Sequence, residues 1–279
     1  AIEPRTQADR ERLAEVLVTL SEEDPTFKVS ANADTGQTLI NGMGELHLEI
    51  LKDRMLREFK VQANAGKPVV AYRETVRETA RAENTFDREF GGRKHFGTVV
   101  LEVTPRARGA GNTISIEASE KQIPSSFHEF VEAGILDGLV TGVVANYPLV
   151  DVAVRVVSGS TNPVDASDVA FRTAANMALR EAARAARPTL LEPLMRAEVV
   201  TPDEHLGDVI GDVNGRRGHI LEVTAGEGIQ TLRANIPLAE MFGYSTQLRS
   251  LSRGRASYSM EPHAFEIVPD NLQTAIINR

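Results

Sequence analysis

Three short segments of the sequence combine glycine with clustered basic residues, and each could contact phosphate groups. They are Gly91-Gly92-Arg93-Lys94-His95, Asn214-Gly215-Arg216-Arg217-Gly218 and Ser252-Arg253-Gly254-Arg255. Glycine permits tight turns that let the backbone approach a ligand closely, and Arg and Lys supply the charge that attracts a polyanion. A solvated surface turn has the same composition, so the sequence leaves that alternative open for each segment.

The chain as a whole is acidic, with a formal net charge of −8. Such a charge argues against a general nucleic-acid-binding surface, because neutralisation of phosphates supplies most of the affinity in such complexes. Small basic loops on an acidic body favour docking onto a large RNA at several points over wrapping around a duplex.

The residue patterns of common catalytic sites are missing from the sequence. It contains no Gly-x-x-x-x-Gly-Lys-Ser/Thr phosphate-binding loop and no Gly-x-Ser-x-Gly nucleophile elbow. The histidines are scattered, with no pair at metal-ligand spacing on a helix. The segment Glu45-Leu46-His47-Leu48-Glu49 could suggest a metal site, but a helix places Glu45 and Glu49 on one face and His47 elsewhere, which favours a solvated surface. We expect no catalytic residue, metal site or cofactor within this chain.

A polar segment from Ser158 to Pro163 precedes the most strongly marked helix, and we expect it to be an exposed loop. The helix is predicted to begin at an Asp165 cap, with Asp168 completing a capping box, and to run to Arg187 before Pro188. Its small apolar residues recur at three- and four-residue steps, which gives a narrow face suited to packing on a sheet. These residues are Phe171, Ala174, Ala175, Ala178, Ala182 and Ala186.

Length and composition indicate an ordinary globular protein of two or three domains, with 279 residues, 42% hydrophobic and 25% charged. There is no run of eighteen apolar residues and no basic-then-apolar leader, so we expect neither a membrane span nor a secretory signal. The absence of cysteine excludes disulfides and fits a reducing compartment. The chain begins at Ala1 in a strand-like segment, and we expect it to be part of a longer protein.

The predicted elements divide the chain into three α+β units, residues 1–77, 78–187 and 188–279. The first has the order βαββαβ. We expect a strand from Ala1 to Glu3, a helix capped by Thr6, strands from Phe27 to Ser30 and from Gln37 to Ile40 around the turn Asn32 to Gly36, a helix opening at Gly42-Met43-Gly44, and a last strand. The predicted apolar positions are Leu13, Val16, Leu17 and Leu20 on the first helix and Leu46, Ile50 and Phe59 on the second.

The third unit repeats this order, as an internal repeat would. We expect a strand from Met195 to Val200, a helix from Pro202 to Val213, a hairpin from His219 to Thr224 and Ile229 to Ile236, a helix from Tyr244 to Arg249, a strand from Ala256 to Met260 and a terminal helix from Asn271 to Asn278.

The middle unit is predicted to contain strands from Thr98 to Thr104, Thr113 to Ala118 and Asp151 to Val157, with a helix from Pro124 to Val140. If the first and last of these strands pair antiparallel, the segments Gly91 to Gly97 and Ser158 to Pro163 emerge at one end of the sheet as a composite tip.

Long runs of the sequence resemble bacterial elongation factor G. The runs GQTLINGMGELHLEILKDRMLREFKV from Gly36 and GKPVVAYRETV from Gly66 are similar to its third domain, and VDASDVAFRTAANMALREA from Val164 resembles the end of its fourth. LLEPLMRAEVVTPDEHLGDVIGDVNGRRGHI from Leu190 and IPLAEMFGYSTQLRSLSRGRASYSMEP from Ile236 are similar to its fifth. The resemblance covers essentially the whole chain.

The resemblance implies a fold and a role. The first and third units would be ferredoxin-like sandwiches, and the middle unit would resemble a ribosomal-protein domain with a left-handed crossover. The protein would be a cytoplasmic translational GTPase that drives movement of tRNA and mRNA on the ribosome, acting as a monomer. GTP and Mg would bind in a GTPase domain preceding Ala1, so this part alone would be inactive as an enzyme.

Site residues follow from the same resemblance. The tip that enters the ribosomal A site, on the 30S side, and meets the codon–anticodon helix would comprise Gly91, Gly92, Arg93, Lys94, His95, Ser158, Gly159, Ser160, Thr161, Asn162 and Pro163. Contacts with large-subunit rRNA, near the stalk-base protein and the sarcin-ricin region, would involve Arg216, Arg217, Arg253 and Arg255. Because the loops after the two helices of a βαββαβ sandwich lie at opposite ends, these arginine pairs should make two separate contacts.

The tip departs from the family pattern in two places. Asn162-Pro163 stands where the family usually has His followed by an acidic residue, and Lys94-His95-Phe96 stands where it has Gly-Gln-aromatic. A paralogue specialised for ribosome recycling or a stress role is therefore an alternative. A non-ribosomal binding module or a small enzyme is a further alternative, which the start at Ala1 disfavours.

Overall fold

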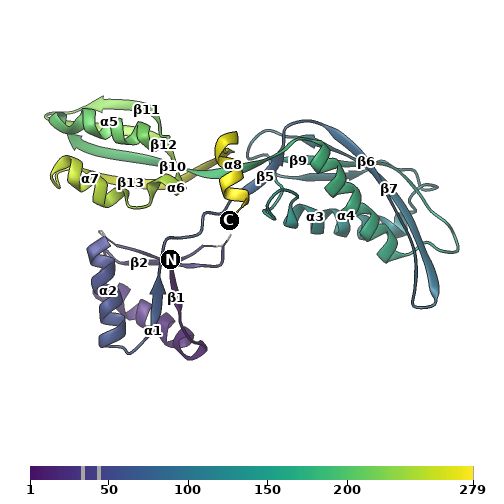
Figure 1. Ribbon diagram of the computed structural model, residues 1–279, viewed down its shortest axis with the longest axis horizontal. Coiled ribbons are helices and arrows are strands. Elements are labelled where there is room, and N and C mark those ends of the chain that lie inside the picture. The colour runs from purple at the N-terminus through teal and green to yellow at the C-terminus, as the bar shows by residue number, and fades with distance from the viewer. Residues whose placement is uncertain (33–34, 43–44, 279) are drawn as a thin grey trace. The chain divides into compact units, whose positions relative to one another are not determined.

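A computed structural model of the chain describes residues 1–32, 35–42 and 45–278, with the backbone only at residues 45 and 46 (Figure 1). Its helices and strands form two compact units, one of Ala1–Ala71 with Pro193–Ala264 and one of Tyr72–Glu192 with Phe265–Arg279. Three sheets with associated helices make up the fold, which confirms the predicted α+β class. No helix within the described ranges has both the length and the apolar character needed to cross a membrane.

The N-terminal sheet has four strands in the order β2-β3-β1-β4. Its elements are β1 (Ile2–Pro4), α1 (Gln7–Glu23), β2 (Lys28–Ala31), β3 (Thr38–Asn41), α2 (Glu45–Arg57) and β4 (Ala63–Ala65). Thr6 caps α1 as predicted, since its side chain accepts a hydrogen bond from the Asp9 amide, and the predicted apolar face of α1 is buried. Residues 33–34 of the predicted turn and 43–44 of the predicted helix start lie outside the described residues.

The buried face of α2 differs from the prediction at Ile50, whereas Phe59 packs against the core as predicted and the Leu46 side chain lies outside the described residues. Ile50 is 52% exposed, whereas Leu51 and Met55 are buried in the core with β1 and α1. Leu48, Leu51 and Met55 recur at three- and four-residue steps, so the sequence contained two apolar stripes and the core uses this one.

The middle sheet has the order β6-β7-β9-β8. Its elements are β6 (Ala80–Phe90), β7 (Arg93–Pro105), β8 (Thr113–Ile116), a short 3-10 helix (Ser125–Phe127), α3 (His128–Thr141), β9 (Val152–Ser160) and α4 (Asp168–Ala185). Strand β6 is absent from the predicted elements, and β7 begins well before the predicted Thr98. Strands β8 and β9 pair in parallel, with α3 in the connection between them.

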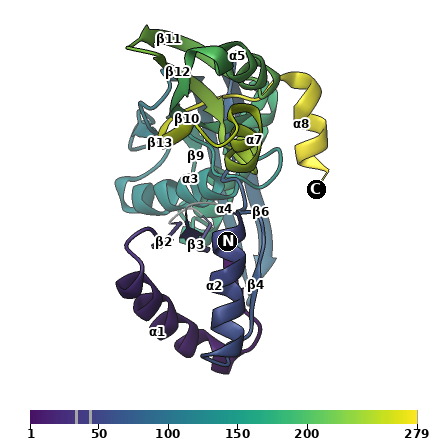
Figure 2. The ribbon, with the colours of Figure 1, turned by 90° about the vertical axis from the view of Figure 1, so that its left-hand side faces the viewer.

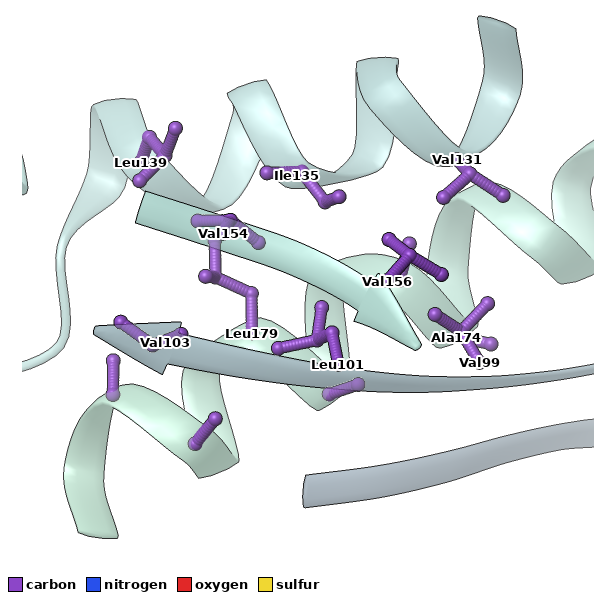
Figure 3. Close-up of a cluster of buried hydrophobic side chains, with 14 of the residues drawn as sticks. Val99, Leu101, Val103, Val131, Ile135, Leu139, Val154, Val156, Ala174 and Leu179 are labelled. Carbon is purple, nitrogen blue, oxygen red and sulfur yellow. The ribbon is translucent and has the colours of Figure 1, made fainter. Parts of the chain in front are cut away.

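The core of this sheet lies between its strands and the helices α3 and α4 (Figure 3). Leu101, Val103, Val154 and Val156 from β7 and β9 meet Ile135 of α3 and Leu179 of α4, together with further residues of the same faces. Gly134 allows the two helices to approach closely, because a Cβ there would lie 2.1 Å from the carbonyl oxygen of Arg172. The predicted apolar face of α4 is fully buried.

The C-terminal sheet has the order β11-β12-β10-β13. Its elements are β10 (Pro188–Pro202), a 3-10 helix (Asp203–His205), α5 (Leu206–Gly215), β11 (His219–Ala225), β12 (Ile229–Pro237), α6 (Leu238–Met241), α7 (Tyr244–Ser252) and β13 (Ser257–Ile267), followed by α8 (Asp270–Ile277). Figure 2 shows α5 and α7 on the same side of these strands, and their core residues form one cluster. All the elements predicted for this region are present, with β10 and β13 longer than expected.

The middle region is anchored where the chain enters and leaves it. Strand β5 (Arg73–Val76) pairs antiparallel with the start of β10, placing Val76 opposite Pro188. Beside this pair, the fully buried carboxylate of Glu74 accepts hydrogen bonds from four backbone amides that follow α3, those of Val143, Val144, Ala145 and Tyr147, at 2.6 to 3.2 Å. A buried carboxylate is stable only with such partners, so Glu74 fixes this loop to β5.

Candidate nucleic-acid interface

The first basic segment forms the turn of a long hairpin. Strands β6 and β7 pair along their whole length, from Ala80 opposite Val103 to Phe90 opposite Arg93. Gly91 and Gly92 form the two-residue turn with φ values of +60° and +78°, which side chains other than glycine disfavour and which suit a tightly twisted hairpin. The turn carries no side chains, so a ligand can approach its backbone.

The hairpin extends beyond the rest of the sheet. Strand β9 pairs with β7 only as far as Thr98, which lies opposite Ser160. Five residues of β7, from Arg93 to Gly97, therefore continue past the last β9 pair, with β6 as their neighbouring strand. Gly91 to Lys94 are exposed at this end.

The segment from Ser158 to Ser160 is not a loop, contrary to the prediction. These residues are the end of β9, and Ser158 accepts a hydrogen bond from the Gln122 side chain at 2.9 Å. Gly159 is required by packing, since a Cβ there would lie 2.5 Å from Ile123 Cγ1 and 2.6 Å from the Thr98 carbonyl oxygen. Small polar residues are uncommon in strands, so their composition suggested a loop, whereas pairing with β7 holds them extended.

The exposed connection begins after β9 and is organised by Asn162. Its Oδ1 accepts a hydrogen bond from the Val164 amide, its Nδ2 donates to Asp165, and its carbonyl oxygen accepts from the Ala166 amide at 2.8 Å. Such bonds from Asn to the following backbone define a compact turn. Thr161, Asn162 and Pro163 thus form an ordered turn at the end of the sheet.

The turn after β9 is attached to the hairpin. The Phe96 amide donates to the Asp165 carbonyl oxygen at 2.7 Å, and Phe96 and Ala166 form a parallel bridge. The antiparallel pairing of β7 with β9 brings both segments to one end of the sheet, which confirms the predicted composite tip.

His95 lies inside this tip and is not part of an exposed basic cluster. It is buried, its Nδ1 lies 2.8 Å from Ser167 Oγ, and its ring stacks on Phe90 with centroids 3.8 Å apart. Ser167, not the predicted Asp165, caps α4 by accepting from the Ala170 amide. The cap was misassigned because Asp165 and Ser167 are both favoured caps, and the Asn162 turn uses Asp165.

The two remaining basic residues of the tip differ in their partners. Lys94 Nζ lies 3.2 Å from Asp87 Oδ1, across the hairpin. Arg93 is exposed and has no ion-pair partner among the described residues. Only Arg93 of the predicted basic segment is therefore available to an outside anion without breaking an internal contact.

The arginines of the second basic segment are held within their own domain. Arg216 donates to Asp212 at 2.8 Å, and its guanidinium lies 4.9 Å from the centre of the Tyr244 ring. Its side chain is only 17% exposed. Arg217 pairs with Glu240 at 3.1 Å. These two residues fasten the end of α5 to α6 and α7.

The third segment divides between a paired and an exposed arginine. Arg255 pairs with Glu204, and this hydrogen bond is the main cause of a lowered pKa of the Glu204 carboxyl. Arg253 ends α7 with a left-handed backbone, φ +51°, and its side chain is exposed. Arg255 thus contacts the residues just before α5, whereas Arg216 follows it, which confirms that the two pairs lie at opposite ends of this helix.

His47 has an acidic partner outside its own segment. His47 Nε2 lies 2.8 Å from Asp24 Oδ2, while the Glu45 side chain is outside the described residues. The pKa of Asp24 is lowered, chiefly by its hydrogen bond from the Thr26 hydroxyl. Within the described ranges, no three His, Cys, Asp or Glu side chains are grouped so that they could hold a metal ion.

Sequence reasoning missed the residues of β6, above all Arg88 and Phe90. In the sequence, Ala80, Ala82 and Phe86 alternate with Arg81, Glu83 and Asp87, and this alternation, followed by Gly91-Gly92, is the signal that could have identified the strand. Charged residues at the alternate positions obscured it.

Comparison with known proteins agrees with this architecture. Three protein families match successive parts of the chain: "Elongation Factor G, domain III" matches residues 1–67, "Elongation factor G, domain IV" matches residues 68–187, and "Elongation factor G C-terminus" matches residues 189–276.

Individual relatives match over the full length of this chain. Elongation factor G of Chlamydia trachomatis serovar D and that of Chlamydia caviae are each 50% identical over 279 residues, all of this chain and 40% of each relative. A crystal structure of a protein from Thermus thermophilus matches all of this chain and 42% of its own, with 34% identity and a TM-score of 0.84. The chain thus spans about 40% of the length of its curated relatives. It belongs to the elongation factor G family and carries that family's domains III, IV and C-terminal domain.

Proposed function

We propose that this chain is the ribosome-binding part of a translation elongation factor that promotes GTP-dependent translocation of tRNA and mRNA. The observation that carries the proposal is the match to three elongation factor G domains in their order over residues 1–276. GTP and Mg would be bound by a domain outside residues 1–279, so we expect no GTP hydrolysis by this chain. The protein would act as a monomer in the cytoplasm.

We also propose a division into three domains, residues 1–77, 78–187 and 188–279. The strand orders β2-β3-β1-β4 and β11-β12-β10-β13 support ferredoxin-like sandwiches in the first and third. The parallel β8–β9 pair supports a ribosomal-protein-like crossover in the middle domain, for which we propose the left hand.

In the middle domain, the tip formed by the Gly91-Gly92 turn and the turn around Asn162 would enter the ribosomal A site on the 30S side. It would contact the codon–anticodon helix there. The support is physical: the tip projects past β9, is held together by the Phe96–Asp165 hydrogen bond, and presents an unpaired arginine. A rigid, weakly charged tip can position itself against RNA with little loss of conformational entropy.

In the third domain, we propose that Arg216, Arg217, Arg253 and Arg255 lie at contacts with large-subunit rRNA and the stalk-base protein. Arg253 would bind phosphate directly, because it is exposed and has no ion-pair partner in the described part of the chain. The other three would hold their loops in shape, since each is already engaged within the domain.

Sedimentation with 70S ribosomes tests the proposal. We expect the chain to co-sediment weakly and in a salt-sensitive manner, because phosphate contacts release counterions. Nucleotide binding by the chain at micromolar affinity, or no association with ribosomes at low salt, would contradict it. In the full-length elongation factor of which this chain would be a part, here called the parent, replacing Arg93 and Lys94 by Ala should slow single-turnover translocation without unfolding the protein.

A second function is favoured by one observation, the presence of Asn162-Pro163 in the tip. Asn cannot take a charge and Pro lacks a backbone donor, so the tip differs chemically from the family pattern. We therefore keep a paralogue specialised for ribosome recycling or a stress role as the alternative. The variant Asn162→His in the parent distinguishes the two: a translocase compensated elsewhere should change little in rate, whereas a large gain would indicate the specialised paralogue.

A further inference from the structure

The projecting hairpin has two chemically different faces. Neighbouring residues of a strand point to opposite sides, and directly paired residues point to the same side. One face of the β6–β7 end thus carries Phe86, Arg88, Phe90, Arg93 and His95, which we call the aromatic face. The opposite face carries Asp87, Glu89 and Lys94, with Phe96 nearer the sheet, and we call it the acidic face.

Contacts between side chains agree with this assignment. On the aromatic face, Phe90 stacks on His95 and meets Phe86 edge-on, with centroids 6.5 Å apart. On the acidic face, Lys94 pairs with Asp87 and leaves Glu89 exposed. The acidic face therefore keeps a net negative charge, while the aromatic face carries two arginines and no carboxylate.

Phe90 is an exposed aromatic ring in a fixed position. It is 45% exposed, although large apolar side chains are usually buried. Its inner face rests on the His95 ring, which is itself held by Ser167. Part of the ring is thus open at the end of the hairpin, and the stack on His95 reduces the rotamer freedom that is lost when a ligand binds.

Charge beside this ring is available for an anion. Arg88 and Arg93 are both exposed, and neither forms an ion pair with any described residue. Arg93 lies opposite Phe90 and Arg88 lies opposite His95, so both arginines are on the same face as the aromatic pair and next to it in the register. An aromatic platform flanked by unpaired arginines is the combination that binds unpaired nucleotides, with the base on the ring and the phosphates on the cations.

We propose that the aromatic face binds single-stranded RNA, with one base stacked on Phe90 and the adjoining phosphates on Arg88 and Arg93. The inference rests on the proposed placement of this tip against RNA, and it adds a site for an unpaired nucleotide next to the codon–anticodon helix, with the face and the chemistry that would bind it. Lys94, one residue from Arg93, lies on the other face and takes no part.

The test uses the 279-residue chain and a fluorescently labelled ten-nucleotide oligouridine. We expect Phe90→Ala to weaken binding about fivefold or more, because stacking of one base is lost. The double variant Arg88→Gln/Arg93→Gln should bind with a weaker salt dependence. The magnitude of the slope of log K against log salt should fall by about 1.4, at about 0.7 for each phosphate contact. Lys94→Gln changes the net charge by the same amount as Arg93→Gln alone. It should bind the oligouridine as tightly as the unmodified 279-residue chain does.

A tryptophan reporter tests stacking directly, because the chain contains no tryptophan. The oligonucleotide should quench the tryptophan fluorescence of Phe90→Trp. It should leave unchanged the fluorescence of Val140→Trp, whose tryptophan is at an exposed position on α3. An unchanged affinity of Phe90→Ala, no quenching of Phe90→Trp, or an equal loss in Lys94→Gln and Arg93→Gln would overturn the proposal. If oligouridine binding fails these tests while the unmodified chain still co-sediments with 70S ribosomes, this inference is wrong and the proposed function stands.

Discussion

The hairpin end and the arginine loops of the C-terminal sheet have similar sequences, but most of the loop arginines are paired with carboxylates and the arginines of the hairpin end are not. Both combine glycine with two basic residues in a turn. In the C-terminal sheet, Arg216, Arg217 and Arg255 meet Asp212, Glu240 and Glu204. At the hairpin end, Arg88 and Arg93 share a face with aromatic rings and no carboxylate.

The difference teaches that a basic turn becomes a binding surface only if the fold keeps its own acids away from it. A guanidinium already bonded to a carboxylate must break that bond to reach an external phosphate, which offsets much of the gain. Four predictions test this distinction, from the largest expected effect to the smallest.

The first concerns Arg216, whose role should be structural. Arg216→Ala removes the Asp212 ion pair and the contact with Tyr244, and it should lower the free energy of unfolding by about 2 kcal/mol. Urea denaturation followed by circular dichroism measures this. The matched control is Arg93→Ala, whose free energy of unfolding should stay within about 0.5 kcal/mol of that of the unmodified chain. Equal stabilities of the two variants would remove the comparison.

The second concerns Ser167, which joins the hairpin end to α4. Ser167→Ala removes the N-cap of α4 and the partner of His95, and a lost cap costs about 1 kcal/mol. The same change should loosen the Phe90–His95 stack and weaken oligouridine binding, which a purely stabilising residue would leave unchanged. Thermal unfolding and the binding assay together separate the two effects, with Thr6→Ala, which removes the cap of α1 in the other compact unit, as the control.

The third concerns the hairpin turn. Gly92→Ala forces a side chain onto a residue with φ +78° and should destabilise the chain by about 1 kcal/mol. Gly207→Ala is the control, because its Cβ would meet no atom and it lies in a helix, where Ala is favoured. A destabilised Gly207→Ala with an unchanged Gly92→Ala would contradict the turn geometry.

The fourth and smallest effect concerns acid. The pKa of Glu204 is below its ordinary value of 4.5 because Arg255 donates to it, so the stabilisation from this pair is present above pH 4.5 and is lost as pH falls through the lowered pKa. Acid titration by NMR should show a pKa below 4.5 for the Glu204 carboxyl, and the Arg255→Gln variant should return this pKa toward 4.5. An unaltered titration in that variant would show that the pair does not form.

Much of the fold follows from local sequence signals. The C-terminal sheet could be predicted strand by strand, because its strands alternate between clear glycine turns. The face of α4 was equally clear from its alanine spacing. Strand β6 was harder to recognise, since its many charged residues obscure the alternation and its last four residues are all exposed.

The position of the candidate tip could be predicted from the sequence, but the partners of its side chains could not. The turn Gly91-Gly92 and the segment near Asn162 were identified, and their proximity followed from antiparallel pairing. Two features set the environments of Lys94, His95 and Phe90. One is the alternation of faces beyond the last β9 pair. The other is a pair of contact partners, Asp87 on the unrecognised strand and Ser167 far away in sequence. Partners supplied by tertiary structure cannot be read from a short motif.

The clamp at Glu74 has a mechanical consequence for the arm. The four amides that it holds follow α3, and the β5–β10 pair beside it is where the chain enters and leaves the middle region. A load applied at the far end of the hairpin would travel along β7 and β9 into this bonded base and would not dissipate in a slack linker. At its base, the middle region is therefore joined to β5 and β10 by hydrogen bonds as well as by the chain itself.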